Sequence, residues 1–104
     1  IRLIELPPDA LGSLRNYVGG LAISDDLETV AISSPVGGAI LTLDAATARP
    51  GTVTLLQSTC GVAQDAGGFI ASNGLGVWRG LDGSPVSEQQ FGFQFDEHLR
   101  RIEI

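Results

Sequence analysis

Two stretches of the chain repeat one pattern: residues 36–44 are VGGAILTLD and residues 74–82 are GLGVWRGLD. Each copy begins with a glycine-containing turn, continues with a short apolar segment and ends at an aspartate. Short β-rich segments bounded by glycine and aspartate are typical of strands joined by tight turns. The pattern therefore predicts that each copy is a turn followed by a strand, repeated within one chain.

The repeat extends to the segments on the N-terminal side of each copy. Residues 19–23 (GGLAI) match residues 60–64 (CGVAQ), and residues 28–34 (ETVAISS) match residues 67–73 (GGFIASN). A unit of about 40 residues that holds four short antiparallel strands has the period of a β-propeller blade. The sequence thus predicts an all-β fold of about two blade-like repeats, in which each quoted copy is the second turn and third strand of a blade.

The predicted boundaries place the whole chain, residues 1–104, in a single β-repeat unit. The first repeat spans about residues 17–58 and the second about residues 59–96. Further strands are expected at residues 1–6 and 99–104, which are similar to one another.

Several turns and one side chain carry specific expectations. Aspartates in the turn at residues 24–26 and at Asp44 are expected to accept backbone N–H bonds from residues just ahead of them. Asn73-Gly74 is the dipeptide typical of a two-residue hairpin turn. Trp78 is expected to lie in a strand and to be largely buried, whereas residues 9–17 allow a single helical turn at most.

Two blades do not close a propeller, which needs roughly four to eight. An open pair leaves sheet edges and apolar faces without partners. Three arrangements remain open from the sequence: the chain is the last part of a longer protein, several copies assemble into a homo-oligomer, or the two sheets fold on each other as a sandwich.

Composition excludes several classes of function. The formal net charge is −6, with six basic and twelve acidic residues, so the field of the protein repels nucleic-acid phosphates. No apolar run approaches the roughly 20 residues of a membrane span, so membrane insertion is not expected. The single cysteine, Cys60, cannot form an internal disulfide bond and is expected to be a small packing residue.

A first candidate site is formed by three consecutive side chains, Arg15, Asn16 and Tyr17. They could form a ligand-binding corner at the mouth of a propeller channel. The alternative is a loop that joins one blade to the next through backbone hydrogen bonds, and this interpretation is favoured.

A second candidate lies near the C-terminal end, where Asp96, Glu97 and His98 follow one another. Consecutive side chains of a strand diverge, so no metal site is predicted, although Asp96 and His98 could share a face and contact a ligand. The sequence offers no catalytic constellation, and neither a catalytic residue nor a cofactor is predicted.

Taken together, LRNYVGGLAIS, AISSPVGGAILTLDAATA, CGVA, GFIASNGLG and FDEHL resemble the C-terminal third of a bacterial family, number fifteen-thirteen of the domain-of-unknown-function series. The resemblance covers about residues 11–99. It implies a propeller similar to the YVTN and WD types, in an exported, periplasmic protein about three times as long. Where this chain has Ala48 a glycine is more typical, so that turn is expected to be shaped differently, and the turn at residues 24–26 lacks the usual Pro-Asp-Gly form.

The leading functional hypothesis is a non-catalytic, propeller-like scaffold that binds a protein partner or small ligand in the bacterial envelope. One alternative is a fragment of a propeller-type hydrolase or oxidoreductase, to which Arg15, Asp96 or His98 would contribute. Another is an accessory role in iron uptake, which the resemblance implies through the neighbourhood of the family's genes.

Overall fold

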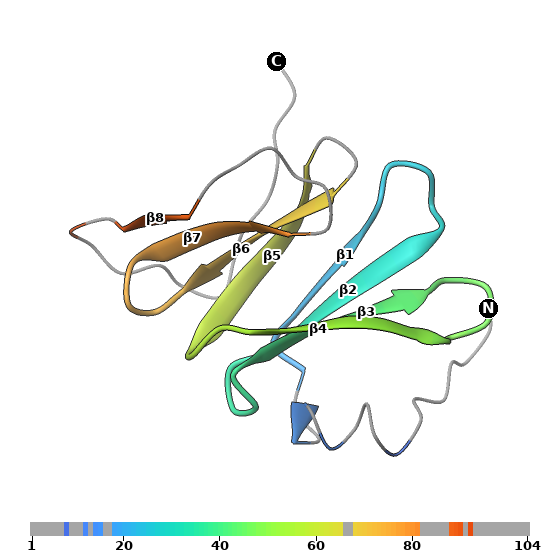
Figure 1. Cartoon of the computed structure of the whole chain (residues 1–104), viewed down its shortest axis with the longest axis horizontal. Helices are drawn as coiled ribbons and strands as arrows, with labels where there is room; N and C mark the ends of the chain where they lie inside the picture. The colour runs from blue at the N-terminus through green and yellow to red at the C-terminus, as the bar shows by residue number, and fades with distance from the viewer. Residues whose placement is uncertain are drawn as a thin grey trace.

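The computed structural model describes residues 8, 12, 14, 15, 18–65, 68–81, 88–90 and 92. These residues form two antiparallel sheets of four strands, and the order of the strands in each sheet is their order in the sequence (Figure 1). The first sheet contains β1 (Gly20–Ile23), β2 (Thr29–Ser34), β3 (Ala39–Asp44) and β4 (Pro50–Leu55). The second sheet contains β5 (Thr59–Asp65), β6 (Gly68–Asn73), β7 (Val77–Leu81) and β8 (Gln89–Gln90).

The all-β, blade-like fold predicted from the repeat is confirmed. The two quoted copies lead into β3 and β7, the third strands of the two sheets. The strands predicted at residues 1–6 and 99–104 lie outside the described residues. None of the described helical residues belongs to a helix that is long and apolar enough to cross a membrane.

Alternation along the strands divides each sheet into two faces. In the first sheet, Ala31 and Ile40 point toward the second sheet, where they pack against Phe69. The complete inter-sheet core consists of Ala31, Ile40, Leu56, Val62, Phe69, Ala71 and Leu81. The innermost strands β1 and β5 approach so closely that a Cβ on Gly20 would lie 3.1 Å from the carbonyl oxygen of Cys60.

The opposite face of the first sheet carries a second apolar cluster. Ile32, Leu41 and Leu43 pack there against Leu14, which has helical backbone conformation and is buried. The carbonyl of Leu14 accepts a hydrogen bond of 2.6 Å from the Ser34 hydroxyl. This bond fixes the residues before β1 to the end of β2.

Two local expectations are corrected by the structure. Gly74 does not take a left-handed conformation, and the turn after β6 has three residues, 74–76, with Gly76 at a φ of 84°. The Asn73 side chain organises this turn, because its Oδ1 accepts hydrogen bonds from the N–H groups of Leu75 and Val77. Trp78 lies in β7 as predicted, but it is half-buried because alternation places it on the face opposite Val77 and Leu81.

Ala48 has a φ of 62°, the left-handed conformation that glycine adopts at least cost. The alanine therefore occupies a position that suits glycine, and the expectation that this turn is shaped differently stays a prediction. Leu27, in the turn after β1, has a φ of 63°.

Candidate functional site

A polar pocket of about 330 Å³ lies at one end of the first sheet. Its walls come from the β1–β2 turn, the β3–β4 turn and the adjoining strand ends, because antiparallel hairpins place alternate turns at the same end of a sheet. We call this end the polar end. The pocket is lined by Ser24, Asp26, Thr29, Thr42, Leu43, Asp44, Arg49, Pro50, Gly51, Thr52 and Phe69.

Asp26 is held by its own turn. Its Oδ1 accepts a 2.6 Å hydrogen bond from the Ser24 hydroxyl and a 3.0 Å bond from the N–H of Glu28. These two bonds stabilise the ionised carboxylate and lower the pKa of Asp26 below its usual value. The exposed Asp26 carboxylate therefore brings a negative charge to the rim of the pocket at neutral pH.

Asp44 likewise accepts hydrogen bonds from its own turn, the β3–β4 turn. Its Oδ1 accepts bonds from the N–H groups of Thr47 and Ala46, at 2.8 and 2.9 Å, and from the Thr47 hydroxyl at 3.0 Å. The bonds from Thr47 are the main reason why the pKa of Asp44 is lowered. The expectation that turn aspartates accept backbone N–H bonds is confirmed for Asp26 and Asp44.

The remaining polar groups of the pocket are hydroxyls and one guanidinium. Thr42 and Thr52 place their Oγ1 atoms 3.1 Å apart across β3 and β4, and Thr42 Oγ1 also accepts the N–H of Thr52. Arg49 is exposed at the rim, and Phe69 of the second sheet contributes an apolar wall. This set of groups can bind a polar segment of a partner by charge and hydrogen bonding.

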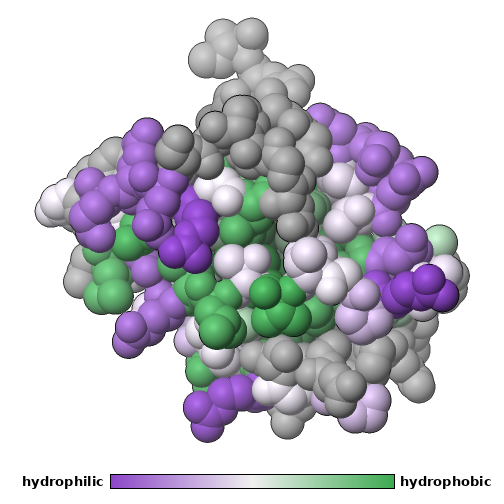
Figure 2. Space-filling view, viewed as in Figure 1, coloured by the Kyte–Doolittle hydropathy of each residue, from purple (hydrophilic) through white to green (hydrophobic). Residues whose placement is uncertain are grey.

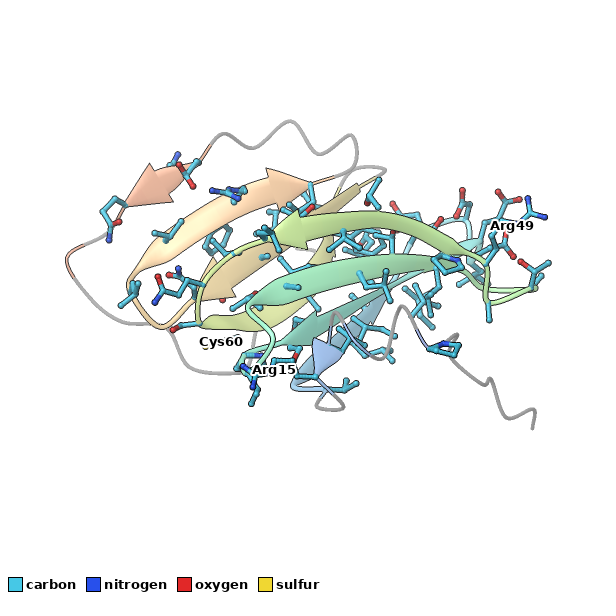
Figure 3. The ribbon with its side chains drawn as sticks, turned by 60° about the horizontal axis from the view of Figure 1, so that its bottom comes forward. Arg15, Arg49 and Cys60 are labelled. Atoms are coloured by element: carbon cyan, nitrogen blue, oxygen red, sulfur yellow. The ribbon has the colours of Figure 1, made fainter. Side chains whose placement is uncertain are left out.

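Of the residues predicted to form a site, Arg15 is described and lies far from this pocket. Figure 3 shows Arg15 and Cys60 near the middle of the molecule, at the end of the first sheet that is opposite Arg49. Arg15 is exposed, has a φ of 51° and donates its backbone N–H to the carbonyl of Gly12 at 3.2 Å. Asn16, Tyr17, Asp96 and His98 lie outside the described residues, so their ligand-binding role stays a prediction.

Cys60 is partly buried where the two sheets meet. Its carbonyl accepts a 2.8 Å hydrogen bond from the Ser33 hydroxyl of the first sheet, and its Sγ lies 3.2 Å from the carbonyl oxygen of Ser58. The described part of the chain contains no group of three or more His, Cys, Asp or Glu side chains placed to hold a metal ion.

Sequence reasoning missed the pocket although it identified the two turns that build it. The signal was present in the order of the strands: the aspartate turns at residues 24–26 and 44–51 are separated by one opposite turn, so they share an end of the sheet. The wall that Phe69 contributes could not be predicted in this way, because it depends on how the second sheet packs against the first.

Comparison with known proteins identifies a matching family and a solved structure with a similar fold. The model of the family described as "Protein of unknown function (DUF1513)" matches residues 1–102. Among solved structures, the chain is similar to BamB from Moraxella catarrhalis, a β-propeller protein, with a TM-score of 0.61 and 24% sequence identity. The match covers 71% of this chain and 24% of the BamB chain, so this chain spans about a quarter of that protein's length. No curated protein matches the chain significantly.

Proposed function

Since the chain belongs to the DUF1513 family, we propose that it is part of a non-catalytic, propeller-like scaffold that binds a protein partner in the bacterial envelope. The observation that carries the proposal is the pair of four-stranded sheets, packed face to face as propeller blades are. The location in the envelope rests on the resemblance to exported proteins of the family.

The polar end of the first sheet is the surface that we assign to partner binding. Propeller blades present their turns at the two ends of the sheets, and loops held by a rigid scaffold are common binding sites. Two ionised carboxylates and Arg49 stand there on turns fixed by side-chain hydrogen bonds. Turns that are ordered before binding lose little entropy when a partner binds.

Site-specific photo-cross-linking in living bacteria tests the proposal. A photoreactive amino acid replaces Leu27, which is 72% exposed in the β1–β2 turn of the polar end. The matched control replaces Leu75, which is 54% exposed in the β6–β7 turn. This turn is the counterpart in the second sheet of the β2–β3 turn, which lies at the end of the first sheet away from the polar end. We expect a defined protein adduct from position 27, recovered in the periplasmic fraction and lost when Arg49→Glu is added.

Three outcomes would contradict the proposal. One is the lack of any adduct at position 27, and another is an equal adduct at both positions. The third is a cytoplasmic adduct, which would contradict the envelope location alone.

A further inference from the structure

Strand β4 is an edge of the first sheet, because it pairs with β3 and with no other strand of the described residues. Five of its six residues are exposed, and Thr54 is the exception. An edge strand presents unpaired backbone N–H and C=O groups, which can pair with a strand of another chain.

The hydrogen-bond pattern shows which backbone groups of β4 point outward. Leu56 donates its N–H to the carbonyl of Gly38 at 2.9 Å, and Thr54 lies opposite Ile40 two residues along the same ladder. Since the backbone direction alternates along a strand, Val53 and Leu55 point their N–H and C=O groups away from β3. The Leu55 carbonyl confirms this, because it accepts a bond from the guanidinium of Arg79 across the gap to β7.

Natural edge strands are protected by charged side chains, prolines or covering segments. β4 has no charged side chain of its own, and its one proline, Pro50, stands at its first position. The guanidinium of Arg79 covers this edge only at the carbonyl of Leu55, and Val53 has no such cover among the described residues. Val53 and Leu55 are 49% and 75% exposed, and alternation places both on one face. Figure 2 shows hydrophobic surface over the C-terminal half of β4 and pale, weakly polar surface over its N-terminal half.

We propose that β4 pairs antiparallel with β4 of a second copy of this chain, with Val53 opposite Val53 of the second copy. The outward N–H and C=O groups of Val53 exchange two hydrogen bonds across the two-fold axis in this register. The two first sheets then form one continuous sheet, and each chain contributes the same patch, as a closed dimer requires.

The side chains of β4 are complementary to themselves in this register. Valine meets valine on the apolar face, and Thr52 meets Thr54 of the second copy on the other face. Apolar pairs and threonine pairs opposite one another stabilise antiparallel strands. Arg49 would lie opposite Gln57 of the second copy, so no like charges face each other although each chain has a net charge of −6. This self-complementarity is the reason why we assign the edge to a second copy.

Two measurements on the whole chain test the dimer. Sedimentation equilibrium from micromolar to near-millimolar concentration is expected to show a monomer–dimer equilibrium. Hydrogen exchange is expected to show that the Val53 and Leu55 amides are protected at high concentration and exchange rapidly on dilution. A chain that stays monomeric throughout, or amides that exchange rapidly at every concentration, would overturn the proposal.

A matched pair of variants shows whether β4 forms the interface. Val53→Lys places like charges opposite each other at the two-fold axis, and we expect it to weaken dimerisation about tenfold. Val36→Lys makes the same change at a valine that is 53% exposed in the β2–β3 turn, and it should dimerise as the parent does. Equal dimerisation of the two variants would overturn the assignment to β4. If Val53→Lys does not fold, amide exchange of the parent chain decides the question. The proposal does not depend on the partner-binding role of the polar end.

Discussion

Ala48 holds a backbone conformation that is costly for any residue with a Cβ atom. Its φ of 62° lies in the left-handed region, which costs an ordinary residue about 1–2 kcal/mol. Glycine relieves this strain but gains entropy in the unfolded chain. We therefore expect Ala48→Gly to raise the free energy of unfolding by about 0.5–1 kcal/mol in urea titrations.

The control for this prediction lies two residues earlier in the same turn. Ala46 is not among the residues with positive φ, so Ala46→Gly gains no relief of strain and should destabilise the chain by about 0.5–1 kcal/mol. Destabilisation by both glycines would show that the turn does not hold Ala48 in the left-handed conformation.

Asp26 and Asp44 connect the stability of the polar end to pH. Hydrogen bonds to the ionised forms lower the pKa of each carboxyl in the folded state. Their contribution to stability is complete above the unfolded pKa, near 3.9, and is lost as the pH falls through the lower folded pKa. We expect the double variant Asp26→Asn, Asp44→Asn to lose less stability on acidification than the parent, as measured by urea titration at a series of pH values.

The comparison with the parent removes the contribution of the other acidic groups, which titrate in both proteins. If the parent and the double variant lost stability in parallel between neutral and acidic pH, the two carboxylates would not be coupled to folding. Asparagine retains an oxygen acceptor, so the turns keep their shape in the variant.

At the scale of the elements, one buried hydroxyl joins β2 to β5 by a hydrogen bond. Ser33 is fully buried and donates to the Cys60 carbonyl, whereas Ser72, its counterpart in the second repeat, is equally buried and its Oγ has no partner among the described residues. Ser33→Ala removes this bond and should cost about 0.5–1.5 kcal/mol, but Ser72→Ala removes a buried hydroxyl that makes no bond and should be neutral or stabilising.

Urea titration of the two variants provides the measurement, and each serves as the control for the other because the chemical change is identical. Equal losses of stability would mean that the bond between Ser33 and Cys60 contributes nothing specific to the contact between the sheets.

The elements themselves could be predicted well because alternation and turn chemistry act locally. The segment 39–44, bounded by Gly38 and Asp44, gave the bounds of β3, and the Asp44 turn followed from a side chain that bonds its own backbone. The turn after β6 could not be predicted in the same way. Asn73 and Gly74 fit a two-residue turn, but Gly76 is the residue that adopts the left-handed conformation. The reason is that Oδ1 of Asn73 accepts hydrogen bonds from the N–H groups of Leu75 and Val77.

At the scale of the whole molecule, prediction from the sequence was limited by contacts between the sheets. The pocket needs Phe69 from β6 to close a wall built by turns of the first sheet. Trp78 was expected to be buried because the repeat places it in the third strand of a blade. Which face of β7 packs on the first sheet was decided by Val77 and Leu81, and local alternation does not specify this.

The core between the sheets predicts that the two repeats unfold together. Phe69 is 2% exposed and packs with residues of both sheets, so Phe69→Ala should cost about 3–5 kcal/mol. A domain of this size is stable by about 5–15 kcal/mol, so the loss should lower protection from hydrogen exchange in β2 and β3 as much as in β6 and β7. Leu75→Ala, at a residue that is 54% exposed, should leave the exchange of both sheets unchanged. If Phe69→Ala lowered protection from hydrogen exchange in the second sheet while β2 and β3 kept theirs, the two sheets would be independent units. The polar end could then bind a partner without the second repeat.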